Sequence, residues 1–279
     1  MEYEIKQMSL SDKSLEEVKD LLHITFPNRK EKFSIDYLRW QYVDNPRGQV
    51  IAYNAYDKEG KLAAHYAVIP IEMVIDGKVI EGVLSLNTAT HPDHRGKRLF
   101  TILAEYTYKR SQELGRKFVI GVANANSTHG FLKNLGFYLI APLEVKVGLG
   151  SPFKKSSYCE KNYIYYDETT LRWRLRCPHF SYSFKGNAIY GKINKPLFHT
   201  AVALIPDGMN VAKLGLKTTS ACLNLYVGLG DRISNLFFKL PGFIKRSPFN
   251  LIFKDISNGE LPQITSENII FRLLDYDVA

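Results

Sequence analysis

The stretch VLSLNTATHPDHRGKRLFTILAEYTYKRSQELG, residues 83–115, decides the fold of this chain of 279 residues. Its first part, up to Thr90, is apolar with β-branched side chains and predicts a strand. A Pro-Asp turn at 92–93 follows. From Leu99 onward, Leu99, Leu103, Tyr106 and Arg110 recur at helical spacing. Gly115 is a typical C-terminal cap. The sequence therefore predicts a strand, a turn and a helix in succession.

The turn carries three cations and a glycine at the predicted start of the helix: Arg95, Gly96, Lys97 and Arg98. The first backbone amides of a helix have no intrahelical acceptor, and the helix dipole adds about half a positive charge there. A strand that leads into such a turn indicates an anion site, and we infer a pyrophosphate as its ligand. The alternative is a solvated basic turn.

The rest of the first half predicts alternating strands and helices. Ser11 or Asp12 is expected to cap one helix and Ser34 a second. The expected strands are 3–8, 50–56, 62–75, 78–90 and 117–122, and the expected helices lie near 14–24, after Ser34 and within 124–134. A further strand is expected to start at Gly136-Phe137.

The tract THPDHRGKRLF, residues 90–100, resembles the coenzyme A loop of the GNAT superfamily of acyl-CoA-dependent N-acyltransferases, whose usual form is Arg/Gln-x-x-Gly-x-Gly/Ala. Arg95 matches the first position, whereas Arg98 stands where the family has glycine and Phe100 where it has glycine or alanine. The resemblance covers residues 1–150. It implies the GNAT fold, of the α/β (α+β) class, with helices flanking a central mixed sheet.

The resemblance also implies how acyl-CoA, either acetyl-CoA or 3-hydroxybutanoyl-CoA, would bind. Its pantetheine amides would pair with the strand that ends at Thr90. Many members carry a tyrosine that protonates the leaving sulfur, but Leu132 occupies that position here. A thiol with a pKa of about 8.5 is a fair leaving group without this acid. The expected cofactor-binding residues are Thr88, Ala89, Thr90, Arg95, Gly96, Lys97, Arg98, Leu99, Phe100, Asn126 and Phe131.

Three polar residues are catalytic candidates for the attack of an amine on the thioester. His65 lies mid-strand, and an ordinary histidine pKa near 6.5 suits proton removal at neutral pH. His129 is closer to the expected cofactor end, and Asn87 is expected to hold the acceptor amine or a water. The alternatives are that both histidines are structural and that the proton leaves through water without a dedicated base.

A faint repeat marks the second half. The tract YLRWQ (37–41), with a proline at 46, resembles TLRWR (170–174), with a proline at 178, but no cationic loop recurs. This pattern predicts a catalytic domain at 1–150 and a degenerate GNAT-like domain at 151–279, with chance similarity as the alternative. Trp40, Arg39 and Trp173 are candidates for an acceptor cleft between the domains, because tryptophan stacks on sugars and arginine binds phosphate. The alternative is two core tryptophans.

Composition excludes several classes. The formal charge is +9, but the cations are dispersed among carboxylates and no nucleic-acid motif appears, so we expect no nucleic-acid partner. No window of 18 apolar residues occurs, which argues against a membrane span. The start, MEYEIKQMSLSDKS, has no secretion signal, so a cytoplasmic protein is expected. The three cysteines and seven histidines lack ligand spacing, so we expect no metal.

Tandem GNAT chains occur among two enzyme groups: tRNA-dependent aminoacyl transferases of peptidoglycan synthesis and N-acyltransferases of nucleotide-linked amino sugars. The stretches WQYVDNPRG and NTATHPDHRG resemble sugar N-acyltransferases, which acylate a dTDP-linked amino-dideoxyhexose for surface polysaccharide. The resemblance implies transfer of an acetyl or 3-hydroxybutanoyl group to such an amine, with acyl-CoA and the nucleotide-linked amino sugar as small-molecule substrates. The alternatives are a tRNA-dependent aminoacyl transferase of peptidoglycan synthesis and a non-catalytic binding module. The sequence leaves the oligomeric state open.

Overall fold

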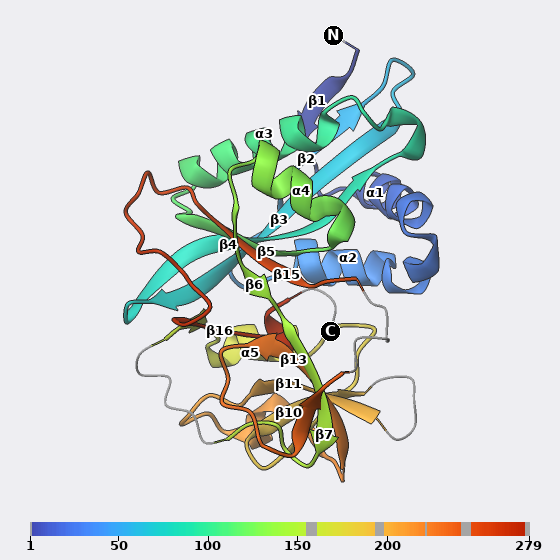
Figure 1. Cartoon of the computed structure of the whole chain (residues 1–279). Helices are drawn as coiled ribbons and strands as arrows, with labels where there is room; N and C mark the ends of the chain where they lie inside the picture. Colours follow the sequence, from blue (N-terminus) through green and yellow to red (C-terminus); the bar gives the residue numbers. More distant parts are fainter. Residues whose placement is uncertain (1, 155–160, 193–197, 221, 241–246, 277–279) are drawn as a thin grey trace.

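The computed structural model describes residues 2–154, 161–192, 198–220, 222–240 and 247–276. It consists of an N-terminal half and a C-terminal half, the upper and lower parts of Figure 1. In the N-terminal half, β1 to β4 pair in sequence order and antiparallel, and β5 pairs with β4 in parallel. These strands are β1 (Glu4–Gln7), β2 (Ile51–Tyr56), β3 (Leu62–Ile75), β4 (Lys78–Thr90) and β5 (Phe118–Ala123), followed by β6 (Tyr138–Pro142).

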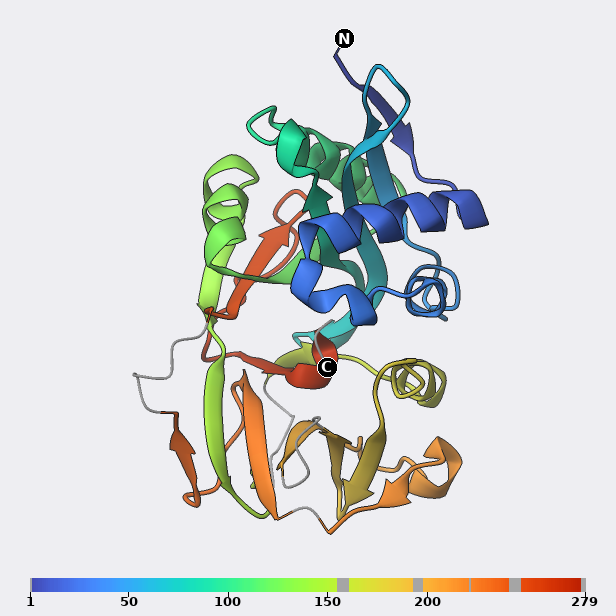
Figure 2. The same ribbon diagram turned by 90° about the vertical axis from the view of Figure 1, so that its right-hand side faces the viewer.

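Helices cover both faces of this sheet (Figure 2). The side chains of α1 (Asp12–Thr25) and α2 (Ile35–Tyr42) pack into one core cluster, and those of α3 (Leu99–Glu113) and α4 (Ala125–Asn134) pack into another. The 3₁₀ turns η1 (Pro27–Lys32) and η2 (Pro92–His94) join these elements. Ser11 and Ser34 cap α1 and α2 as expected, and the predicted α/β class is confirmed.

The C-terminal half repeats the same pairing order. Its strands β9, β10 and β11 pair antiparallel, and β13 pairs with β11 in parallel, as β5 does with β4. Where α3 would stand between β11 and β13, the described residues form only a 3₁₀ turn and a short strand. The elements of this part of the chain are β7 (Glu144–Leu149), β8 (Asn162–Ile164), α5 (Glu168–Arg174), β9 (Tyr182–Lys185), β10 (Ala188–Lys192), β11 (Phe198–Leu204), η3 (Val211–Leu214), β12 (Lys217–Thr218), β13 (Leu223–Leu229), β14 (Phe237–Lys239), β15 (Asn250–Asp255), β16 (Ile269–Arg272) and η4 (Leu273–Asp275).

The two halves exchange one strand each. β15 lies between β5 and β6 and pairs antiparallel with both. In the same way, β7 lies between β13 and β14 of the other half (Figure 1). A division at residue 150 therefore assigns β7 and β15 to the half whose sheet they do not join. The pairing residues of β15 and β5 are more than 100 positions apart, and no local pattern encodes such a contact.

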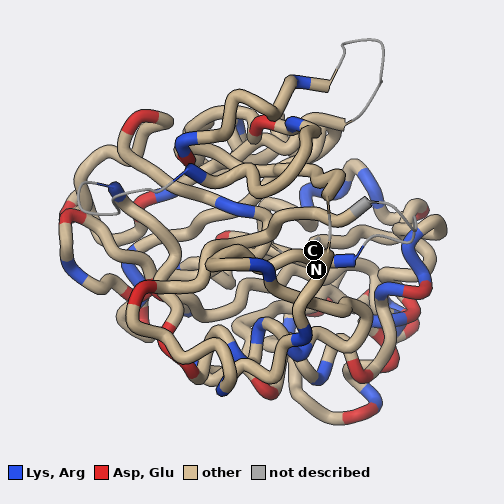
Figure 3. Tube along the Cα trace, turned by 90° about the horizontal axis from the view of Figure 1, so that it is seen from below, with Lys and Arg blue, Asp and Glu red and all other residues tan. Residues whose placement is uncertain are grey.

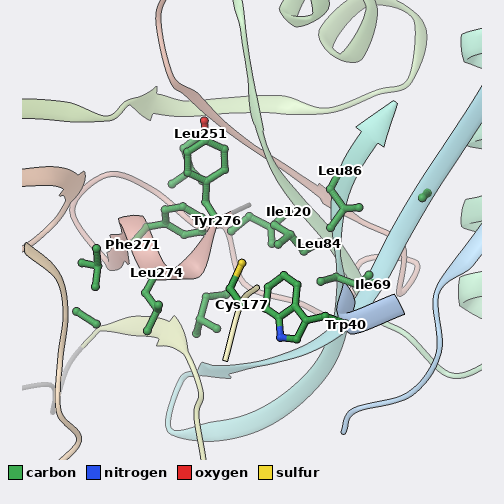
Figure 4. Packing of buried hydrophobic residues seen from close by; sticks show 14 of the residues in the cluster. Trp40, Ile69, Leu84, Leu86, Ile120, Cys177, Leu251, Phe271, Leu274 and Tyr276 are labelled. Carbon is green, nitrogen blue, oxygen red and sulfur yellow. The ribbon is translucent and has the colours of Figure 1, made fainter. Parts of the chain in front are cut away.

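One hydrophobic core runs through both halves. Trp40, Ile69 and Leu84 of the first half share a cluster with Cys177 and Phe271 of the second (Figure 4). The strands β8 and β16 complete the connection, because β8 pairs with β3 and β16 pairs with β8 and β13. Exchanged strands and a shared core predict that the halves unfold together.

Candidate active site

The parallel strands β4 and β5 separate towards their carboxyl ends. They pair only over Val83–Ser85 of β4, while β4 continues to Thr90 and β5 to Ala123. A bulge lies at the start of the separated part, because the β3–β4 register shifts between His65 and Ala67. Within this bulge Asn87 has a left-handed backbone, with φ of 47°. Beyond Ser85, the edge of β4 that faces β5 is not paired with it. The backbone of this edge can form hydrogen bonds with the amides of an extended ligand.

The cationic turn lies at the start of α3 and is exposed. Arg98, the residue before the helix, has a left-handed backbone with φ of 59°, the conformation that favours the glycine usual in the GNAT loop. Lys97 pairs with Glu2 at 3.4 Å. Within the described residues, the side chains of Arg95 and Arg98 have no ion-pair or hydrogen-bond partner. Two guanidinium groups are thus available to a ligand.

Helix α3 also leaves its first amides uncapped. It has no side-chain cap and no acidic residue in its first turn. The other four α-helices among the described residues have side-chain caps: Ser11, Ser34, Asn124 and Asp167. An uncapped N-terminus beside two free guanidinium groups can bind an anion such as a diphosphate.

Several predicted cofactor residues contribute packing. Leu99 is buried, and the Phe100 ring lies edge-on to Phe131, with centroids 5.1 Å apart. Phe100 also lies against Gly130, where a Cβ atom would be 3.0 Å from the ring. Gly130 thus makes room for the bulky residue that stands where the family has a small one, and sequence reasoning missed it.

The remaining predicted residues border this region. Thr88, Ala89 and Thr90 form the separated end of β4, where Ala89 and Thr90 pair with β3 on one edge. Asn126 and His129 are exposed on α4. Asn124 caps α4 through a capping box with Ser127.

His65 is fully buried, and its two ring nitrogens have partners. Nε2 lies 3.0 Å from the Tyr42 hydroxyl and Nδ1 2.7 Å from Asn54 Oδ1. Burial lowers the pKa of His65 to about 3, so the ring stays neutral at physiological pH. Asn87 joins the same network through its Nδ2, which donates to Tyr42 at 3.0 Å and to Gln41 Oε1 at 2.6 Å. The structure therefore brings His65 and Asn87 together but separates His65 from solvent.

A buried hydroxyl cluster lies on the α3 side of the sheet. The Tyr66 hydroxyl is 2.8 Å from Ser85 Oγ and 2.5 Å from the Tyr108 hydroxyl. Burial raises the pKa of both tyrosines, which keeps their protons in place. Ser85 is the last residue of β4 that pairs with β5, so the cluster lies where the strands part. Sequence reasoning missed it, because its members are distant in the chain.

Trp40 and Trp173 form a reciprocal joint between the halves. Their rings stack with centroids 5.0 Å apart, and each indole Nε1 donates to the other's backbone carbonyl at 2.9 Å. Arg174 lies over the Trp40 ring at 5.4 Å. Trp40 is 6% exposed, which matches the core alternative better than stacking on a sugar.

A charged cleft of about 670 Å³ borders this joint. Its pairs Asp36 and Thr169, Arg39 and Arg172, and Trp40 and Trp173 are each 133 positions apart. Arg39 pairs with Asp12, and Arg172 with Glu168. Arg176 also lines the cleft, and its side chain has no partner within the described residues. The three predicted acceptor residues thus lie together at one cleft.

Charges elsewhere are mixed. Lys and Arg are interspersed with Asp and Glu along the trace (Figure 3). Across the described ranges, no group of three or more His, Cys, Asp or Glu side chains is arranged to hold a metal ion. The helices in the described part of the chain are all too short or too polar to cross a membrane.

Comparisons with known proteins agree with this fold. Residues 6–140 match the family model of the acetyltransferase (GNAT) domain. A probable N-acyltransferase from Enterococcus faecalis V583 is similar over 92% of this chain and 73% of its own, with 10% identity and a TM-score of 0.61. GCN5-related N-acetyltransferases from Kribbella flavida (8% identity, TM-score 0.60, 92% and 72% covered) and Anabaena variabilis (11%, 0.59, 90% and 72%) are similar too. A comparison with curated proteins gives no match. The chain has the GNAT fold.

Proposed function

We propose that this protein is an acyl-CoA-dependent N-acyltransferase. The observation that carries the proposal is the uncapped start of α3, with unpaired Arg95 and Arg98, beside the separated ends of β4 and β5. The diphosphate of CoA fits the turn, since it accepts hydrogen bonds from amides and guanidinium groups. The pantetheine arm fits the opening, because its amides can pair with the free edge of β4 near Ala89.

The reaction needs little from the protein. The lone pair of a neutral amine forms a bond to the thioester carbon, the C–S bond breaks, and sulfur leaves as a thiolate. The amine proton passes to water or to the thiolate. A backbone amide of the β4 bulge near Asn87 is suited to stabilise the oxyanion. His65 is not required as the base, because its lowered pKa makes it a poor proton acceptor.

The proposed acceptor is a nucleotide-linked amino sugar of the dTDP-3-amino-3,6-dideoxyhexose type, and the transferred group is acetyl or 3-hydroxybutanoyl. The charged cleft beside Trp40 supports an acceptor that carries phosphate, because Arg176 borders it without a partner in the described chain. We propose a cytoplasmic location for the protein, where both substrates would be supplied.

We propose further that the chain arose by duplication, with a catalytic first half and a second half that has lost its coenzyme site. The support is the shared pairing order, the reciprocal exchange of β7 and β15 and the reciprocal bonds of Trp40 and Trp173. Such two-fold exchange is typical of a swapped dimer whose chains became fused. Where α3 stands in the first half, the described residues of the second half form only η3 and the short strand β12.

Titration calorimetry with acetyl-CoA and 3-hydroxybutanoyl-CoA tests cofactor binding. Arg95→Ala is expected to weaken binding about tenfold, the low end for a charge-assisted hydrogen bond at an exposed site. Lys109→Ala is the matched control, because it removes an exposed cation from the other end of α3. Equal affinities of the two variants would place the diphosphate elsewhere.

Turnover then separates the alternatives. Release of CoA thiol with the dTDP-linked amino sugar, but not with its 3-hydroxy analogue, supports the full proposal. Binding of acyl-CoA without turnover of any amine indicates a non-catalytic module. Absence of CoA binding, together with transfer from an aminoacyl-tRNA, indicates the tRNA-dependent class.

A further inference from the structure

A continuous hydrogen-bonded chain of side chains runs across strands β4, β3 and β2, from the β4 bulge to helix α1. Its five links measure 3.0, 3.0, 2.7, 3.1 and 3.1 Å. The members, in spatial order, are Asn87, Tyr42, His65, Asn54, Tyr56 and Glu17.

The far end of this chain sets its direction. The Glu17 carboxylate can only accept, so the Tyr56 hydroxyl donates to it. The Tyr56 oxygen in turn accepts from Asn54 Nδ2. Asn54 is therefore oriented with its Oδ1 towards His65.

This orientation selects one tautomer of His65. Asn54 Oδ1 accepts, so His65 Nδ1 carries the hydrogen. The ring is neutral because burial lowers its pKa to about 3, which leaves Nε2 as an acceptor. Tyr42 donates to Nε2, and its oxygen accepts from Asn87. Every link thus donates towards Glu17.

The near end of the chain is the Asn87 amide. Its Nδ2 is engaged by Tyr42 and Gln41, so its Oδ1 points the other way. Within the described residues this oxygen has no partner, and the Asn87 residue is 8% exposed. Asn87 lies two residues beyond Ser85, where β4 and β5 begin to part. An accepting oxygen is thus presented next to the opening.

We propose that His65 and Tyr42 are positioning residues, aligned by Asn54, Tyr56 and Glu17, which hold Asn87 so that its Oδ1 accepts an N–H from the acceptor amine. The inference rests on the proposed function. An amine that donates one N–H to Asn87 keeps its lone pair free for the thioester. A reversed Asn87 would present an NH₂ group, which repels the amine hydrogens and attracts the lone pair.

The hydrogen-bond direction is tested without turnover. In ¹⁵N-labelled wild-type protein, the His65 imidazole is expected to show hydrogen on Nδ1 and no titration between pH 5 and 9. Tyr56→Phe removes the acceptor that orients Asn54, so a mixture of tautomers is expected. Tyr53→Phe is the control, because Tyr53 lies on the same strand but outside the hydrogen-bonded chain. This variant should keep the wild-type spectrum. Hydrogen on Nε2 in the wild type, or titration near pH 6–7, would overturn the proposal.

Kinetics test the effect on the amine, with acetyl-CoA and 2-amino-2-deoxyglucose as probes. Tyr56→Phe is expected to raise the KM for the amine about fivefold, equivalent to one hydrogen bond, and to leave the KM for acetyl-CoA and the shape of the pH profile unchanged. Equal amine KM values for Tyr56→Phe and Tyr53→Phe would refute the positioning role. Absence of turnover of any amine by the wild type would refute the proposed function and the role of Asn87 with it, while the His65 spectrum would still decide the tautomer.

Discussion

Removal of one indole from the joint between the halves should destabilise the whole protein. Trp40→Phe removes the bond from Nε1 to the Trp173 carbonyl and part of the stacked ring. The lost hydrogen bond costs about 1 kcal/mol, and the lost packing of a 6%-exposed side chain adds about 1 to 2 kcal/mol. The expected loss of unfolding free energy is about 2 to 3 kcal/mol, or about 5 to 10 °C in Tm.

The reciprocal geometry predicts a similar loss for Trp173→Phe. Each substitution removes a different hydrogen bond, because each indole donates to the other's backbone. Only the ring contact is shared, so a double-mutant cycle should give a coupling of about 0.5 to 1.5 kcal/mol.

The chain has two tryptophans, so their fluorescence reports on this joint alone. Urea unfolding followed by fluorescence and by far-UV circular dichroism should give coincident transitions, since β7 and β15 tie each half to the other. Two separate transitions, or a coupling within about 0.3 kcal/mol of zero, would contradict this account of the joint.

Two further predictions concern single residues. Arg98→Gly should raise the unfolding free energy by up to about 1 kcal/mol, because it removes a non-glycine residue from a left-handed conformation; a lower Tm by calorimetry would contradict this. Burial raises the pKa of Asp275 to about 6, so between about pH 4 and pH 6 the folded state binds more protons than the unfolded state. Stability contributed by this group is therefore present below pH 4 and is lost as the pH rises through 6, by about 2 to 3 kcal/mol. The difference in unfolding free energy between the wild type and Asp275→Asn should change over this window, and a constant difference would contradict the prediction.

Much of the first half could be predicted from residues close together in sequence. Ser11, Ser34 and Asn124 cap their helices through contacts with residues two or three positions on, which a sequence pattern records directly. The strand, turn and helix of residues 83–115 also formed where expected, with the cationic turn exposed. Polar and apolar periodicity reports on such local geometry because one face of each element is buried.

The candidate site could be predicted only in part from such local sequence patterns. His65 has the residue type of a general base, but its two nitrogens are occupied by Tyr42 and Asn54, and the burial that lowers its pKa comes from the packed sheet. Gly130 matters only because Phe100 lies against it. Neither relation has a signature in the sequence.

By itself, the sequence determined the order of the elements in the first half, the exposed cationic turn and the likeness of two Leu-Arg-Trp tracts, because these depend on neighbours within a few residues. Only the tertiary structure decided that β7 and β15 change places, that Trp40 and Trp173 bind each other, and that one hydrogen-bonded chain leads from Asn87 to Glu17. The physical reason is that the exchanged strands and the tryptophan joint bring together residues far apart in the sequence, and the chain from Asn87 joins three strands and two helices. Such partners are selected by burial and hydrogen-bond completion in the packed protein.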